Sequence, residues 1–313
     1  MQVGARGRIR RAPFQLRPSA RPVLQRTLSL WLRHLPRLAA IAGLIWIPTY
    51  LIQVVLATAF GLTGSLATVR AVSAHAAQGG GRMTSFDLAA LQSVVAWVGV
   101  YLVLSLLVTW VALAASQAAL IRAGADADLT GTVEISAALA AVPAGFGGLL
   151  AAWAVTVLIL LGFVALVIAV GVGLMFVAGW FGAGILVTVV LVLVLLGMTL
   201  APLAVFARLA LAPPLVVLEG SGAMASLRRS NQLLRPYFGT AFLVLVVLGI
   251  CGWLGSMLFS IPGRLTAGDF QLIVSFASAA LGAALLAPLP QVGLAVLHRA
   301  IQPTSGDRWP GRI

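Results

Sequence analysis

The chain has 313 residues, of which 61% are hydrophobic and only 9% are charged. Soluble domains carry about 25% charged residues, so this composition excludes a soluble globular protein and is typical of an integral membrane protein. The net charge of +13 is concentrated at one end, because nine of the twenty arginines precede Leu38, and this pattern favours a basic tail over a nucleic-acid-binding face.

Residues 1–22 contain no acidic residue, several prolines and glycines and no apolar period, and we expect them to be disordered. A twin-arginine signal at Arg10-Arg11 would need a closely following apolar region, and an organellar transit peptide would carry more serine and fewer prolines. We therefore interpret this segment as a retained cytoplasmic tail. Its arginines would attract anionic lipid, each contributing about 1 kcal/mol near the membrane surface.

Six apolar segments are long enough to cross a bilayer as helices, since one crossing needs about 20 apolar residues. They are apolar on all sides, which favours helices over the alternating strands of a barrel. Two of them divide the 73 uncharged residues between Glu134 and Arg208. The predicted fold is all-α, a polytopic membrane helical bundle with spans at about 38–60, 91–115, 147–171, 181–207, 238–261 and 272–297.

The arginines also predict an orientation. With both termini inside, seventeen arginines lie on the inner side and three, Arg70, Arg82 and Arg264, lie outside. We therefore expect a multi-pass protein of the cell membrane, and specifically of a bacterial inner membrane, with both termini cytoplasmic. Residues 23–300 would form the six-span domain and residues 301–313 a short cytoplasmic tail.

A short amphipathic segment followed by a proline precedes the first, third and fifth spans. The prolines are Pro36, Pro143 and Pro236, and each can end one helix and begin the next. We expect three copies of one unit: an interfacial helix, an elbow and a helical hairpin. Such repeats occur in transport folds, but they are also a simple way to build any six-span bundle.

Small residues should allow the fifth and sixth spans to pack closely, because lipid gives apolar helices no hydrophobic drive to associate. The predicted contact joins a stripe with Gly252 at its centre to a stripe of small residues spaced by four; the stripes are Gly249, Gly252, Gly255 and Ser256, and Ser275, Ala279, Ala283 and Ala287. Cys251, the single cysteine, is expected to pack in the core.

The stretch Arg208–Tyr237 is the charged island between two long apolar runs. Pro213 and Pro214 are predicted to break the fourth span. The following Gly220-Ser221-Gly222 predicts a turn, in which Ser221 is a plausible N-cap for a helix over residues 223–234.

Glu219 has two interpretations. It pairs with Arg228 or Arg229 and fixes the elbow, because an acid near hydrocarbon is costly unless paired, or it belongs to a polar site for a headgroup or solute. Arg228 and Arg229 are correspondingly either interface anchors or phosphate contacts.

Catalytic signals are absent from the sequence. Asp126-x-Asp128 has the spacing of a metal-binding pair but is better interpreted as a loop or helix start, and His34, His75 and His298 are far apart. No GxSxG, P-loop or HExxH motif occurs. We expect no enzyme activity, no cofactor and no metal site.

Residues 213–237 resemble the signature of the glycerophosphodiester phosphodiesterase membrane domain family, and residues 27–48 look like its opening helix and first span. Asn231 stands where that family usually has Trp, and the matching residues are Pro213, Pro214, Glu219, Gly220, Leu227, Arg228, Arg229, Ser230 and Leu233. The resemblance implies a stand-alone six-span membrane domain. It does not imply phosphodiesterase activity, because the chain has no room for the catalytic domain to which family members are fused.

Two functions remain open. The preferred one is a non-enzymatic membrane domain that engages membrane lipids, through anionic headgroups, or a partner protein at the inner-face elbow, Glu219–Arg235. The alternative is a transporter of a small or lipidic solute. Polar residues for a hydrophilic path are few, which disfavours a hydrophilic substrate; they are Gln53, Gln92, Ser105, Thr109, Gln117 and Thr199.

Overall fold

The computed structural model describes residues 19–61, 68–69, 71–75, 85–180, 184–266 and 270–302. These residues are helical nearly throughout and contain no strand, so the all-α prediction is confirmed. Almost all of the predicted N-terminal tail, much of the segment after the first span and most of residues 301–313 lie outside the described residues.

The elements are α1 (Ala20–Ala59), α3 (Ser85–Thr130), α4 (Ile135–Trp180), α5 (Gly184–Leu209), α6 (Ala212–Glu219), α7 (Ala223–Leu234), the 3-10 helix η1 (Arg235–Tyr237), α8 (Phe238–Leu265), α9 (Phe270–Leu286) and α10 (Pro288–Ile301). Six helical stretches are long and apolar enough to cross a membrane, which confirms the predicted number.

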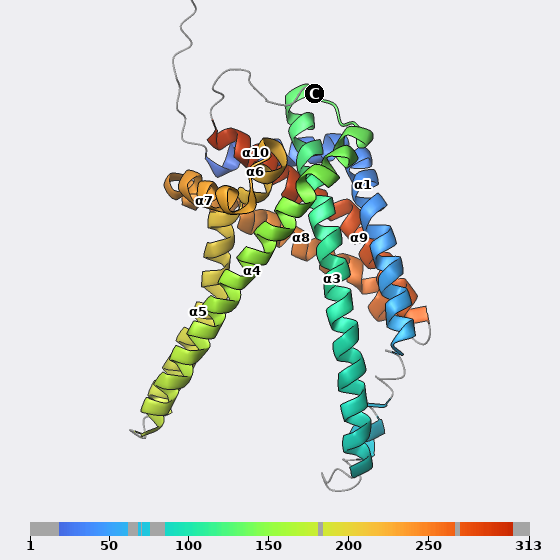
Figure 1. The fold of residues 1–313 in the computed structure, drawn as a ribbon, viewed down its shortest axis with the longest axis vertical. Coiled ribbons are helices and arrows are strands. Elements are labelled where there is room, and N and C mark those ends of the chain that lie inside the picture. The colour runs from blue at the N-terminus through green and yellow to red at the C-terminus, as the bar shows by residue number, and fades with distance from the viewer. Residues whose placement is uncertain are drawn as a thin grey trace, which may run out of the picture.

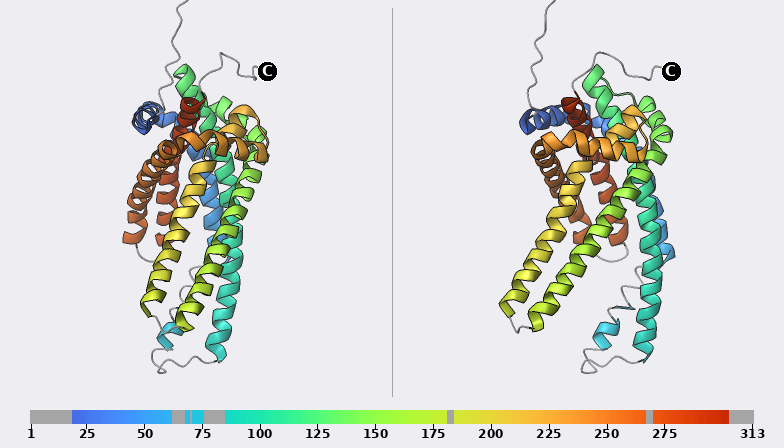
Figure 2. Two further views of the ribbon diagram at one scale, coloured as in Figure 1. Left: turned by 90° about the vertical axis from the view of Figure 1, so that its left-hand side faces the viewer. Right: turned by 60° about the vertical axis from the view of Figure 1, so that its left-hand side comes forward.

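The long helices diverge from a common end. Figure 1 shows α4 and α5 forming one leg and α3, α1 and α9 the other, while the short helices α6, α7 and α10 gather where the legs meet. We call this end the hub and define it as residues 20–38, 112–130, 135–149, 210–241 and 288–301. Figure 2 shows the first turns of α1 lying across the hub and the remainder running along the bundle.

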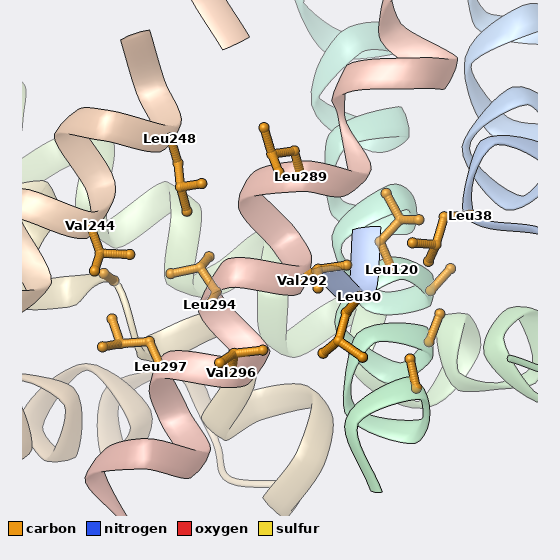
Figure 3. Close-up of a cluster of buried hydrophobic side chains, with 14 of the residues drawn as sticks. Leu30, Leu38, Leu120, Val244, Leu248, Leu289, Val292, Leu294, Val296 and Leu297 are labelled. Atoms are coloured by element: carbon orange, nitrogen blue, oxygen red, sulfur yellow. The ribbon is translucent and has the colours of Figure 1, made fainter. Parts of the chain in front are cut away.

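The buried core lies mainly in the hub and not along the spans. Eleven of the fourteen residues of α10 are buried, and around it pack buried side chains such as Leu38, Leu120, Val244 and Leu248 (Figure 3). Farther along the legs most large apolar side chains are exposed, as Leu158 and Leu193 are. Such exposure costs nothing in hydrocarbon, because lipid tails are as apolar as leucine.

Two glycines allow α10 to lie at the centre of the hub. A Cβ added at Gly124 of α3 would stand 3.1 Å from Cα of Val292, and one added at Gly293 would stand 2.3 Å from Cδ1 of Leu248 in α8. A larger residue at Gly124 would press on the backbone of α10, and one at Gly293 would displace the Leu248 side chain.

The three proline elbows differ in form. Pro36 and Pro143 lie inside the continuous helices α1 and α4, so the expected interfacial helices are the first turns of the longer ones. Only before the fifth span does the chain make a separate amphipathic helix, α7, which η1 with Pro236 divides from α8. A proline removes one backbone hydrogen bond, and a helix can continue past it with a bend.

The sixth predicted span, 272–297, is two helices. The chain breaks at Ala287, and Pro288 begins α10, where its missing N–H needs no partner. The 17 residues of α9 extend about 25 Å, somewhat less than the roughly 30 Å hydrocarbon core, and α10 packs into the hub.

The predicted contact between the fifth and sixth spans involves Gly255 and Ser275 of the two predicted stripes, each against a partner outside the stripes. An added Cβ would lie 2.3 Å from Leu286 at Gly255 and 2.2 Å from Ser275 at Gly263, so α8 and α9 do approach closely. The expectation for Gly252 is wrong, because an added Cβ there meets no described atom within 4 Å. The predicted core position of Cys251 is also wrong: its side chain is exposed.

Candidate functional site

The prolines of the charged island begin α6. The fourth span ends at Leu209, and Pro213 and Pro214 fall in the first turn of α6, where backbone N–H groups have no intrahelical partner. The predicted break at these prolines is therefore confirmed. Pro214 is buried in the hub.

Gly220 ends α6 in the left-handed conformation, with φ of 65°. Its N–H donates to the Val216 carbonyl at 3.1 Å, and the Ser221 N–H donates to the Leu215 carbonyl at 3.4 Å. The first bond, from the glycine N–H to the carbonyl four residues earlier, is the αL motif, which satisfies a terminal carbonyl of a helix and favours glycine. The Ser221 hydroxyl also donates to the Leu215 carbonyl, at 2.9 Å. The prediction that Ser221 caps α7 is wrong, because Ser221 closes α6 and Gly222 precedes α7.

Ser230 joins the end of α5 to the start of α6. Its hydroxyl donates to the Arg208 carbonyl at 2.9 Å and accepts from the Leu211 N–H at 3.1 Å. The residue is fully buried. One hydroxyl thus satisfies two backbone groups that the helix break leaves without partners, so Ser230 has a structural role.

Glu219 is the centre of a polar cluster between α6, α7 and α10. Its carboxylate accepts from Arg229 through Oε2 and from the Gln302 side chain through Oε1 at 2.8 Å. The His298 Nε2 lies 3.2 Å from the same Oε1. The expected pairing of Glu219 is therefore confirmed for Arg229, whereas Arg228 takes no part in it.

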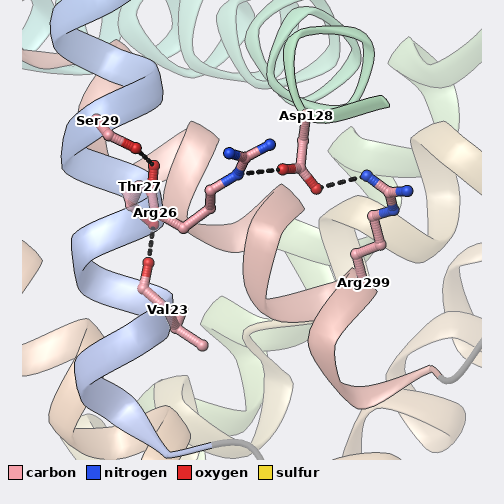
Figure 4. A network of polar contacts seen from close by, with 6 residues as sticks. All are labelled: Val23, Arg26, Thr27, Ser29, Asp128 and Arg299. Atoms are coloured by element: carbon pink, nitrogen blue, oxygen red, sulfur yellow. Dashed lines mark hydrogen bonds and ion pairs between the residues drawn. The ribbon is translucent and has the colours of Figure 1, made fainter. Parts of the chain in front are cut away.

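Asp128 forms a second cluster, which sequence reasoning missed. Figure 4 shows its carboxylate between Arg26 of α1 and Arg299 of α10, with contacts of 2.8 and 2.6 Å. Both Asp126 and Asp128 lie in the last turns of α3 and not in a loop, and Asp126 pairs with Arg122 at 3.1 Å. The available signal was the scarcity of acids, since an acid in so apolar a chain needs a basic partner.

Three arginines near α7 differ from those in the clusters. Arg228 and Arg235 are exposed, lie seven residues apart and therefore share a face of the chain. Arg208, at the end of α5, places its guanidinium 5.7 Å from the centre of the Phe238 ring. None of the three contacts a carboxylate within the part of the chain that the structure describes.

Most polar side chains within the spans bond to backbone carbonyls of their own helix, and two side-chain pairs join separate helices. The Gln53 amide donates to the Thr109 hydroxyl at 2.8 Å, and the Trp153 indole donates to Gln117 Oε1 at 2.8 Å. Both pairs join separate helices, so they contribute to helix association in the way typical of membrane proteins. Of the described residues, no group of three His, Cys, Asp or Glu side chains could hold a metal ion.

The residues singled out from the sequence thus separate into three sets. Pro213, Pro214, Gly220 and Ser230 shape the backbone, and Glu219 with Arg229 ties α6 to α7 and α10. Of the predicted site residues, Arg228 is an exposed arginine that contacts no carboxylate of the described residues, and Arg235 lies on the same face. The arrangement can offer guanidinium donors to an anion.

Comparison with known proteins gives one match. The family model described as a domain of unknown function (DUF7847) matches residues 119–300, from the hub portion of α3 to the end of α10. No curated protein and no solved structure matched the chain. The resemblance of residues 213–237 to the glycerophosphodiester phosphodiesterase membrane domain family stays a prediction. Because the match covers more than half of the sequence, the chain belongs to the DUF7847 family.

Proposed function

We propose that this chain is a non-enzymatic domain of the cell membrane that binds anionic phospholipid headgroups on the exposed arginine face of α7. In this proposal the hub lies at the cytoplasmic surface and both termini are cytoplasmic. Of the two functions open from the sequence, lipid engagement is favoured because the elbow presents exposed guanidinium groups that pair with no carboxylate of the described residues, and because its acid, Glu219, is already paired.

The observation that carries the proposal is the difference between neighbouring arginines. Arg229 is used by Glu219, while Arg228 and Arg235 are exposed and contact no carboxylate of the described residues. The opposite face of α7 is buried in the hub through Ser226, Leu227 and Leu234. An amphipathic helix held this way, across the ends of apolar spans, has the geometry of a helix in the membrane interface (Figure 1).

The chemistry fits phosphate. A guanidinium presents N–H donors in a planar fork that matches two phosphate oxygens, and it is more weakly hydrated than the ammonium of lysine. Every basic residue of this chain outside histidine is arginine. Anionic headgroups would also offset the charge of the hub.

The charge balance supports the same end of the molecule. The described residues of the hub, together with Arg208, contain ten arginines and three acids, a net charge of +7. Excess arginine favours the cytoplasmic side, and each such charge near an anionic leaflet contributes about 1 kcal/mol. This argument supports both the orientation and the class of ligand.

A transporter is the second candidate, but the spans contain few polar groups that could bind a hydrophilic solute. Gln53 and Gln117 are already bonded across helices, and few other polar groups lie within the spans. A hydrophilic solute would therefore lose its hydration without replacement partners.

Lipid retention measured by native mass spectrometry tests the proposal. Protein extracted from vesicles of mixed anionic and zwitterionic phospholipid is compared with the Arg228→Ala/Arg235→Ala double variant. Two lost contacts of about 1 kcal/mol each correspond to roughly 30-fold weaker binding at low salt. The control is Arg264→Ala, which removes an exposed arginine from the far end of α8. Retention that falls only in the double variant supports the proposal, and equal retention in all three proteins contradicts it.

A further inference from the structure

A partly enclosed cavity of about 310 Å³ lies where the α4–α5 leg joins the hub. It is bounded by α4, α5, α6, α8 and α10, with Gln117 contributed by α3, and its walls are almost entirely apolar. The volume is at the low end of ligand pockets, which range from about 300 to 1,000 Å³. The space therefore suits one extended apolar chain better than a whole lipid.

The few polar groups in the wall are largely satisfied. Thr156 donates to the carbonyl of Ala152, and the Trp153 indole donates to Gln117 Oε1. No hydrogen bond of the described residues uses the Gln117 Nε2. A cavity with such walls does not hold water well, because a buried water needs two to four polar partners.

A cation stands beside this cavity. Arg208 follows one wall residue, Ala207, and precedes another, Leu209. Its guanidinium lies over Phe238, whose ring centre is 5.8 Å from that of Phe242, a third wall residue. Arg208 is exposed and contacts no carboxylate in the described parts of the chain. An apolar cavity with an uncompensated cation next to it is complementary to an amphiphile with an anionic head.

We propose that one acyl chain of an anionic phospholipid enters this cavity while the phosphate of the same lipid contacts Arg208. The site is separate from the arginine face of α7 and does not depend on it. Transfer of a chain from the bilayer into the cavity gains no hydrophobic free energy, since both surroundings are apolar. Selection therefore comes from the Arg208–phosphate contact and from the shape of the cavity.

Two glycines of α8 provide a matched test. Added Cβ atoms at Gly249 and at Gly252 both meet no described atom within 4 Å, so a side chain can begin at either position without a clash at its Cβ. Gly249 lines this cavity, whereas Gly252 lines a different space between α8 and α9. Gly249→Leu fills the proposed site, and Gly252→Leu is the control in the same helix.

The experiment uses a phospholipid with a photoreactive group in its acyl chain, prepared with an anionic and with a zwitterionic headgroup. After irradiation of the full-length protein in nanodiscs, the labelled peptides are identified by mass spectrometry. The wild type should be labelled by the anionic lipid on the peptides that carry the cavity wall. That labelling should fall at least fivefold in Gly249→Leu and in Arg208→Gln and stay unchanged in Gly252→Leu.

Two further variants separate the possible interpretations of the labelling. Leu203→Trp fills the same cavity from α5 and gives a second reading if Gly249→Leu fails to fold. The Arg228→Ala/Arg235→Ala variant should keep its cavity labelling, so loss of the α7 site and loss of this one are distinguishable. Labelling that is equal in wild type and both filled variants, or equal for the two headgroups, overturns the proposal.

Discussion

Removal of the Ser230 hydroxyl should destabilise the hub more than its single oxygen atom suggests. In Ser230→Ala the Arg208 carbonyl and the Leu211 N–H both lose their partner, and the site is fully buried. An unsatisfied buried polar group costs about 1–3 kcal/mol. With partial relaxation at the α5–α6 break, we expect a loss of about 2–4 kcal/mol in the free energy of unfolding.

Ser226→Ala is the matched control. Ser226 is equally buried and lies one turn earlier in α7, but its hydroxyl donates only to the Ala223 carbonyl within the same helix. Loss of that bond should cost less than about 1 kcal/mol, because no backbone N–H depends on it. The assay is unfolding in mixed micelles, followed by circular dichroism, with wild type and both variants side by side. Equal destabilisation of the two variants would refute the assignment of Ser230 as the link between α5 and α6.

Three further variants test the packing. Asp128→Ala removes the shared partner of two arginines and should lower the free energy of unfolding by about 1–3 kcal/mol. This loss should become smaller as salt is added, because salt screens ion pairs. A loss that does not depend on salt would contradict the ion-pair account. Gly255→Leu should reduce the yield of folded protein, because even a Cβ at this position would overlap Leu286. Gly252→Leu should leave the yield unchanged. Equal yields of the two variants in size-exclusion chromatography would contradict the α8–α9 contact. Trp153→Phe removes the donor to Gln117 and should lower the free energy of unfolding by about 0.6 kcal/mol, the average for hydrogen bonds between membrane helices. A loss above about 2 kcal/mol would contradict the view that the indole contributes mainly through this hydrogen bond.

The broad architecture follows from composition and local signals. Long uncharged runs predict spans because the bilayer imposes one length on all of them. Pro213 and Gly220 act within one or two turns of their own position, so the break before α6 and the turn after it were predictable. The break before α10 was also signalled by Pro288 and Pro290, but the surrounding apolar run hid it.

The pairing of the polar residues was much less accessible. Asp128 meets partners 102 and 171 positions away, and the bonds of Ser230 span 19 and 22 positions. No pattern in a single sequence encodes which of many arginines approaches a given acid. The cap role of Ser221 was misassigned for a related reason. A serine between two helices can bond to the end of the first helix or to the start of the second, and only the fold decides between them.

Hydropathy likewise could not locate the core. Leu258 is 63% exposed and Leu297 is fully buried, yet both lie in apolar runs of the same character. In a membrane protein, lipid-facing and protein-facing positions have similar composition, so burial depends on which helices meet. Here they meet at the hub, around α10.

Direct mapping of headgroup contacts tests the central claim most sharply. An anionic phospholipid with a photoreactive group on its headgroup is irradiated with the wild-type protein in membrane vesicles, and the modified residues are identified by mass spectrometry. The account predicts modification concentrated in α7 and η1, around Arg228 and Arg235, and competition by unlabelled anionic lipid. Modification spread evenly over the arginines of both ends, or unaffected by that competitor, would contradict it.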